Sequence, residues 1–195
     1  SATFSNEIIS LAKNIVYKPV EISINPKQTT ANTVKQWVIP VDKKRKAELL
    51  AHLIKSNNWL QVLVFSKTKQ YQMHSPKRVA ELLNKNEITT LAIHGNKSQG
   101  ARTKALAEFK QGKVRVLVAT DIAARGLDIE QLPMVINFDL PNVPEDYVHR
   151  IGRTGRAGLE GQAISLVGPE EYSLLSGIES LIKKVLERST EKGFE

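Results

Sequence analysis

Short runs of consecutive apolar residues alternate along most of this chain with segments of helical periodicity. Residues 62–65 and 116–119 are apolar at every position, which is typical of parallel strands covered by helices on both faces. Strands are expected over residues 34–41, 61–65, 89–93, 114–119, 134–138 and 161–167. Helices are expected over residues 6–16, 43–56, 75–86, 98–111, 144–154 and 170–186. This alternation predicts an α/β fold with a doubly wound parallel sheet and helices on both faces.

The segment after the expected strand at 134–138 has the most unusual composition. Residues 149–158 read His-Arg-Ile-Gly-Arg-Thr-Gly-Arg-Ala-Gly, with three arginines at three-residue spacing. Arginine presents a planar fork of donors that matches phosphate oxygens, and glycine lets the backbone approach a ligand closely. A basic surface helix ending in a glycine turn is the alternative, but such a face tolerates lysine and needs no alternation of glycine with arginine. The segment therefore indicates an anion site.

Composition and charge narrow the class of protein. The chain has 195 residues, 41% of them apolar, which suits one α/β domain with an appendage. A net charge of +8 and a pI near 9.6 favour a polyanionic partner, either a nucleic acid or a membrane surface. The sequence has no run of 18 apolar residues and no cysteine, and its four histidines lack metal-ligand spacing. We therefore expect a cytoplasmic protein without a membrane span, disulfide or metal site.

Polar residues follow several expected strands, where ligands of such sheets bind. Ser66 and Thr68 can hold phosphate or cap a turn. Ser98 is expected to cap a helix with Gln99 and Arg102 on its first turn, where free amides favour an anion. Arg102 could also be an ordinary exposed charge.

Two further expectations concern capping and exposure. Asp121 is expected to cap a short turn, and Asp42 is expected to cap the helix at 43–56. The basic run at 43–46 is interpreted as a solvated face of that helix.

Two segments carry a specific resemblance to a known family. Residues 120–129, Thr-Asp-Ile-Ala-Ala-Arg-Gly-Leu-Asp-Ile, and residues 149–158 resemble the fifth and sixth motifs of the DEAD-box RNA helicases. Residues 1–3, 65–68 and 94–102 resemble weaker elements of the same family in the same order. The resemblance covers nearly the whole chain and implies a RecA-like fold.

The order of these motifs implies the domain organisation. Residues 1–17 would be the remnant of a first RecA-like domain, beginning at the third motif. Residues 18–33, which contain a short alternating piece at 20–24, would be an interdomain linker. Residues 34–188 would form the C-terminal RecA-like domain, and residues 189–195 would begin a C-terminal extension.

The resemblance also implies roles for individual residues. Arg153 and Arg156 would reach the γ-phosphate of ATP as arginine fingers, and Asp128 would accept hydrogen bonds from the ribose. Contacts with the RNA are implied for Thr68, Gly95, Gln99, Arg102, Thr120 and Gly126. Interdomain contacts are implied for Ser1, Thr3, Arg125, His149 and Arg150.

A nucleotide-hydrolysing enzyme also needs a phosphate loop and a magnesium-binding acidic motif, and neither occurs in this sequence. We therefore expect that the chain alone neither hydrolyses ATP nor unwinds RNA. ATP with Mg²⁺ would be held mostly by the missing first domain. The expected partners are single-stranded or duplex RNA, that first domain, and ribosome-assembly or RNA-decay proteins, with no membrane.

Three other interpretations remain open. One is a DNA translocase of the same helicase superfamily, which the Gly-Arg-Thr-Gly-Arg-Ala-Gly segment disfavours. The second is a stand-alone RNA-binding module without nucleotide dependence, and the third is a protein-docking role. Within the family, the segments between motifs look most like the bacterial RhlE group.

The apolar residues of 1–17 would lack the domain that they belong to, and they could pack against a second copy of the chain.

Overall fold

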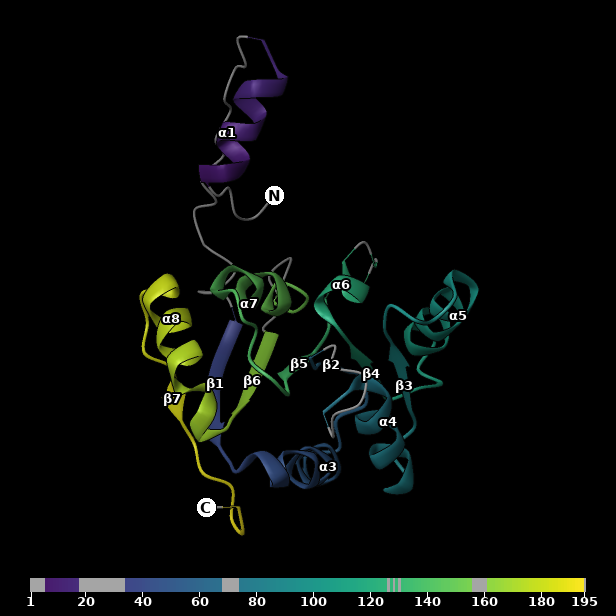
Figure 1. The fold of residues 1–195 in the computed structure, drawn as a ribbon. Coiled ribbons are helices and arrows are strands. Elements are labelled where there is room, and N and C mark those ends of the chain that lie inside the picture. Colours follow the sequence, from purple (N-terminus) through teal and green to yellow (C-terminus); the bar gives the residue numbers. More distant parts are fainter. Residues whose placement is uncertain are drawn as a thin grey trace.

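In the computed structural model, all strands of the described chain form one parallel sheet (Figure 1). The structure describes residues 6–17, 34–67, 74–125, 127, 129, 131–155 and 161–194. The strand order across the sheet is β3-β4-β2-β5-β6-β1-β7. The strands are β1 (Val34–Pro40), β2 (Val62–Phe65), β3 (Thr90–Ile93), β4 (Val116–Ala119), β5 (Met134–Asn137), β6 (Gly161–Val167) and β7 (Glu187–Arg188). The predicted doubly wound parallel sheet is confirmed.

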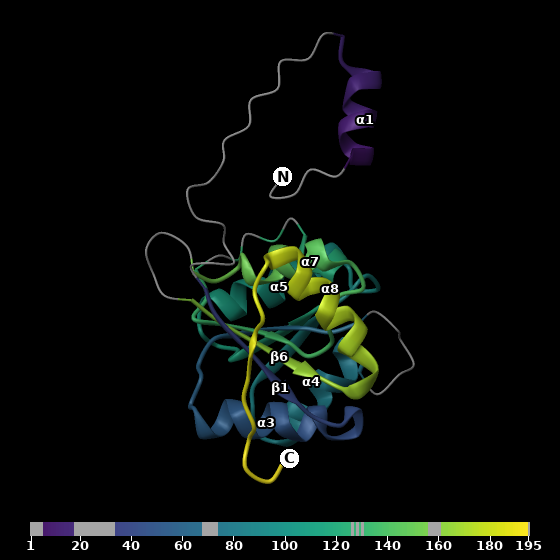
Figure 2. The ribbon, with the colours of Figure 1, turned by 90° about the vertical axis from the view of Figure 1, so that its left-hand side faces the viewer.

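Helices cover both faces of this sheet (Figure 2). One face packs against α3 (Lys46–Ser56) and α4 (Pro76–Lys85). The other packs against α5 (Gln99–Lys110), α6 (Asp121–Ala124), α7 (Pro144–Ile151) and α8 (Tyr172–Ile182). Short 3-10 turns, Lys43–Arg45 and Pro169–Glu171, precede α3 and α8.

The apolar runs of the sequence divide between these two faces. Val62 and Val64 of β2 belong to the cluster under α3 and α4, while Leu63 and Phe65 belong to the cluster under α5 and α6. Successive side chains of a strand point to opposite faces, so a strand covered on both sides has to be apolar throughout. This explains why the strongest strand signals in the sequence are uninterrupted apolar runs.

Serine side chains cap the starts of α4 and α5, and the cap by Ser98 was expected from the sequence. The hydroxyl of Ser75 accepts a hydrogen bond from the amide of Arg78 at 3.4 Å, and that of Ser98 accepts one from Ala101 at 3.3 Å. Asp42 makes no side-chain cap, so the cap expected there is wrong, and the chain enters α3 through the 3-10 turn. Thr120, and not Asp121, caps α6, since its hydroxyl accepts from the amide of Ala123 at 3.3 Å.

Several helices and strands begin or end at other residues than the periodicity of the sequence predicts. The helix expected over 170–186 ends at Ile182, because Lys183 adopts a left-handed conformation with φ 53°. The chain then turns to form β7 on the edge of β1, which the sequence did not predict. The arginine-bearing helix begins at Pro144, as expected, but it ends at Ile151, three residues before the expected end at Thr154.

The packed body continues beyond β7 to the last described residue. Phe194 is only 8% exposed and joins the core cluster under α3. The guanidinium of Arg45 lies 4.4 Å from the centre of its ring, and Nη2 of Arg45 donates to the carbonyl of Gly193 at 2.7 Å. The segment that the sequence assigned to a C-terminal extension therefore packs on the domain itself.

Replacing Phe194 by alanine is expected to lower the free energy of unfolding by about 1–2 kcal/mol. A Phe-to-Ala change in a closed core costs about 3–5 kcal/mol, and the loss here is smaller because the end of the chain can adjust. Urea denaturation of the variant measures it, with Val185→Ala, 77% exposed, as a control expected to stay within about 0.5 kcal/mol. Equal urea midpoints for the two variants would contradict the conclusion that Phe194 packs into the core.

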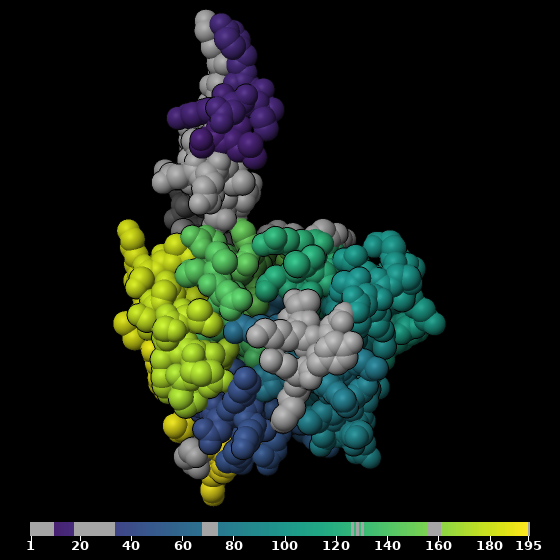
Figure 3. Space-filling view, in the orientation of Figure 1, coloured from purple at the N-terminus to yellow at the C-terminus, as the bar shows by residue number. Residues whose placement is uncertain are grey.

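The helix α1 (Asn6–Ile15) stands apart from the layered body (Figure 3). Leu11 and Ile15 of this helix are 54% and 73% exposed. The expected linker at 18–33, with its alternating piece at 20–24, lies outside the described residues, as do Ser1 and Thr3.

Candidate nucleotide and nucleic-acid interface

Residues of the two arginine-bearing motifs meet beside the carboxyl ends of β2 and β4, on the side of the sheet that carries α6 and α7 (Figure 1). They enclose a shallow hollow of about 20 Å³. Its walls are Phe65, Asp121, Ala124, Arg125, Asp146, His149, Arg150 and Arg153. The structure thus brings the two segments singled out from the sequence into one site.

Arg150 forms the buried base of this site. Its side chain is 2% exposed, and its Nε and Nη2 donate to the two carboxylate oxygens of Asp121 at 2.6 and 2.8 Å. Its Nη1 donates to the carbonyl of Asp139 at 2.6 Å and to Oδ1 of Asn137 at 3.2 Å. The guanidinium also lies 5.0 Å from the ring centre of Phe65. An interdomain contact by Arg150, as the resemblance implies, would have to open this network.

A second carboxylate holds the outer residues of the site. Asp146, on the first turn of α7, accepts from Nη2 of Arg125 at 2.8 Å. Nδ1 of His149 lies 3.7 Å from the same carboxylate oxygen. Arg125 is 65% exposed at its side chain, so this ion pair is screened by solvent and holds its geometry weakly. Arg125 and His149 therefore face outward from the domain, where a second surface could reach them.

Arg153 lies two residues beyond α7, in the turn that leads to Gly155. Its described partner is the carbonyl of Leu127, which accepts from Nη1 at 3.2 Å. The chain can turn sharply here because Gly155 adopts a positive φ of 67°. Among the described residues, Arg153 thus has one hydrogen-bond acceptor, whereas the guanidinium of Arg150 has several.

The start of α5 forms another part of this surface. Gln99 is exposed, and its Oε1 accepts from Nη1 of Arg102 at 3.2 Å. Nη2 of Arg102 donates to the carbonyl of Ala123 in α6 at 3.1 Å, which ties α5 to the fifth motif. The Nε of Arg102 is buried without a partner among the described residues. A methyl group at Gly95 would meet nothing within 4 Å, so its backbone faces open space.

The remaining predicted site residues fall into two groups. Thr120 is 1% exposed, and its hydroxyl is used as the cap of α6, so an RNA contact by that hydroxyl would compete with the cap. Outside the described residues lie Ser1, Thr3, Thr68, Gly126, Asp128 and Arg156.

A buried ionic cluster beside the site was not predicted from the sequence. Lys46 is 0% exposed, pairs with Glu171, and donates to the carbonyl of Phe138 at 2.9 Å. Nδ1 of His74 lies 2.8 Å from Oδ1 of Asp139, whose other oxygen accepts from the amide of Lys67 at 2.9 Å. The interpretation of residues 43–46 as a solvated face is therefore wrong for Lys46. The cluster joins the segments that follow β1, β2, β5 and β6.

The pKa of Asp139 reflects competing effects within this cluster. Burial alone would raise the pKa, but the hydrogen bond to His74, the charge of Lys46 and the amide of Lys67 outweigh it and lower the pKa. The carboxylate therefore contributes stability at neutral pH, and this contribution is lost as the pH falls through the folded-state pKa.

The described residues support neither a membrane-spanning helix nor a metal site. None of their helices has both the length and the apolar character needed to cross a membrane. They also contain no group of three or more His, Cys, Asp or Glu side chains arranged to hold a metal ion.

Comparison with known proteins places these motifs in a family. Residues 45–158 match the family described as the helicase conserved C-terminal domain. The chain belongs to this helicase family. The helicase domain is 39% identical over 191 residues to the DEAD-box ATP-dependent RNA helicase CshA of Bacillus subtilis, covering 98% of this chain and 38% of that protein. The chain thus spans well under half the length of this curated relative.

Solved structures agree with this assignment. The helicase domain superposes on Escherichia coli SrmB, solved bound to the regulator RraA, with a TM-score of 0.76 and 35% identity, covering 83% of this chain and 94% of that one. It superposes on Saccharomyces cerevisiae Dbp5, solved bound to RNA and ADP BeF3, with a TM-score of 0.84 and 29% identity, covering 97% of this chain and 50% of that one. The expected RecA-like C-terminal domain of a DEAD-box RNA helicase is confirmed, whereas the RhlE subgroup is not.

Proposed function

We propose that this helicase domain forms one wall of the ATP and RNA cleft of an ATP-dependent RNA helicase, with a first RecA-like domain as the other wall. The observation that carries the proposal is the outward-facing group of Arg125, His149 and Arg153 around a hollow of only about 20 Å³. That volume holds little more than one water molecule. A site that is cationic yet too shallow to enclose a nucleotide fits a surface that completes a site on another domain.

In this proposal Arg153 and Arg156 bind the γ-phosphate of ATP from across the cleft. Hydrolysis of ATP spreads negative charge over the transferring phosphoryl group, and guanidinium donors stabilise that charge. Arg150 supports Arg153 from below, because its buried network holds the end of α7 against α6 and the segment that follows β5. Asp128 binds the ribose, where a carboxylate is not repelled by phosphate.

The RNA strand is proposed to run along the start of α5 and the fifth motif. Gly95 exposes its backbone there, and Gln99 and Arg102 present side-chain donors. The amides of the first turn of α5 favour a phosphate group. Thr68, Thr120 and Gly126 complete this proposed surface. The relative Dbp5, which was solved with RNA, supports RNA as the ligand.

The same proposal makes the chain inactive by itself. It places Mg²⁺ and most contacts to ATP on the first domain, since the described residues offer no carboxylate cluster for a metal ion. Ser1, Thr3, Arg125 and His149 would contact that domain. We further propose a cytoplasmic location and partners among ribosome-assembly or RNA-decay proteins. The SrmB structure, which contains a regulator, supports binding of proteins by this half.

Nucleotide-dependent RNA affinity tests the proposal. A fusion of this chain to the first RecA-like domain of CshA is expected to bind a fluorescent single-stranded RNA at least tenfold more tightly with ADP BeF3 than without nucleotide. The chain alone is expected to bind the same RNA weakly, with a salt slope of about 0.7 per phosphate contact. If the fusion binds RNA equally tightly with and without ADP BeF3, the alternative of a stand-alone RNA-binding module would be favoured.

A further inference from the structure

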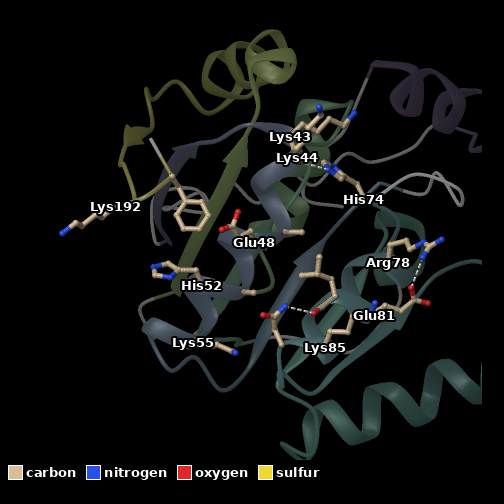
Figure 4. A pocket seen from close by; sticks show the side chains of 15 residues that line it. Lys43, Lys44, Glu48, His52, Lys55, His74, Arg78, Glu81, Lys85 and Lys192 are labelled. Atoms are coloured by element: carbon tan, nitrogen blue, oxygen red, sulfur yellow. Dashed lines mark hydrogen bonds and ion pairs between the residues drawn. The ribbon is translucent and has the colours of Figure 1, made fainter.

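A groove on the other side of the sheet is much larger than the hollow beside Arg153. It lies between α3 and α4, extends to the C-terminal tail, and has a volume of about 890 Å³ (Figure 4). Because α3 and α4 cover the face opposite to α6 and α7, this groove shares no residue with that hollow. The function proposed above leaves it without a role.

The floor of the groove is apolar and shaped by small side chains. Ala47 and Ala51 lie one turn apart on α3, and their small size leaves space between α3 and α4. Leu82 of α4 and Phe194 of the tail supply larger apolar surfaces. An apolar floor of this kind is typical of grooves that accept the apolar face of an amphipathic helix.

The rim of the groove is basic, with lysines on both of its sides (Figure 4). Its two carboxylates are already neutralised, since Glu48 lies 3.4 Å from Arg45, and Glu81 lies 3.5 Å from Arg78 and 3.8 Å from Lys77. None of the rim lysines forms an ion pair with a described residue. These lysines are Lys43, Lys44, Lys55, Lys85 and Lys192. The rim therefore presents uncompensated positive charge around an apolar floor.

The spacing of these charges suits a helical ligand. Lys44 lies in the 3-10 turn before α3 and Lys55 near the end of α3, a separation of roughly 16 Å for 11 steps at the rise of an α-helix. That length corresponds to about three turns of a helix lying along the groove. Acidic side chains along both edges of such a helix could then meet lysines of α3 and α4.

We propose that this groove binds an acidic amphipathic helix of a partner protein, with apolar side chains on the floor and carboxylates against the lysine rim. RNA fits the groove less well, because single strands bind through aromatic faces on which bases stack. Among the Phe, Tyr and Trp rings of the described residues, Phe194 alone lines the groove, and it is 8% exposed and packs against Arg45 and His52. Charge complementarity and an apolar floor together favour a protein segment.

The test uses a fluorescein-labelled 18-residue peptide of leucine, alanine and glutamate, with its leucines on one helical face. The groove variant Lys44→Glu, Lys55→Glu, Lys85→Glu is expected to weaken binding of this peptide at least tenfold. A matched variant with the same change in net charge, Lys104→Glu, Lys113→Glu, Lys184→Glu, is expected to stay within twofold. Its lysines are all exposed and outside the groove. Thermal unfolding confirms that both variants fold.

A second variant separates docking from simple charge attraction. Leu82→Lys adds a positive charge but places it in the apolar floor, so docking predicts at least fivefold weaker binding and pure electrostatics predicts tighter binding. The proposal is overturned if the peptide does not bind the unmodified chain, if groove and control variants lose affinity equally, or if Leu82→Lys binds more tightly. Loss of single-stranded RNA binding in the groove variant, with peptide binding kept, would instead assign the groove to RNA.

Discussion

Replacing Arg153 by lysine is expected to lower RNA-dependent ATP hydrolysis about 1,000-fold in a two-domain helicase that contains this chain. A planar guanidinium can bridge two phosphate oxygens, whereas an ammonium group is a point charge on a flexible stem. An arginine finger contributes on the order of 10³ to 10⁵ in rate. Since Arg153 has a single described hydrogen bond within the domain, to the carbonyl of Leu127, its loss should hardly affect folding.

The measurement is the steady-state rate of ATP hydrolysis at saturating RNA, with the CshA first domain fused to this chain. Arg188→Lys is the matched control, because Arg188 pairs with Glu179 beside β7, away from the site, and is expected to keep activity within about twofold. A loss in kcat with an unchanged KM for ATP would indicate an interaction made in the transition state. A loss of less than tenfold for Arg153→Lys would assign this arginine to RNA binding or structure instead.

Replacing Arg150 by methionine, unlike replacing Arg153, is expected to lower the stability of the domain substantially. The change leaves the carboxylate of Asp121 and the carbonyl of Asp139 without the donors they have in the folded domain. Removing one partner of a fully buried ion pair costs about 3–5 kcal/mol, but water can reach the 30% exposed carboxylate of Asp121, so the free energy of unfolding should fall by about 2–3 kcal/mol.

Urea denaturation of the isolated chain checks this value, and Arg125→Met provides the control. Arg125 also pairs with an aspartate at 2.8 Å, but its side chain is 65% exposed, so its loss should cost less than about 1 kcal/mol. Similar losses for both variants would show that the Arg150 network does not stabilise the domain. Arg150 of the sixth motif and Arg125 of the fifth motif are thus distinguished by their effects on stability.

Local patterns in the sequence predicted most of the fold. The runs at 62–65 and 116–119 became the buried strands β2 and β4, and Ser98 caps a helix as expected. These features depend on neighbours along the chain, which a sequence displays directly.

Features that depend on distant residues were missed. The charge of Lys46 looked like part of a solvated face, yet its partner Glu171 lies 125 positions away. Periodicity placed Arg150 on a helix. It could not reveal that Arg150 would be buried and would form a bidentate ion pair with Asp121, 29 positions earlier. His74 and β7 were missed for the same reason, since their contacts form only when distant strands come together.

The most direct single measurement is ATP hydrolysis by the fusion, compared with the first domain alone and with this chain alone. We predict that only the fusion hydrolyses ATP at a rate that RNA stimulates, because phosphate loop and arginines would then meet in one cleft. RNA-stimulated hydrolysis by this chain alone, or by the first domain alone at the rate of the fusion, would contradict the proposal that this domain completes the ATP site.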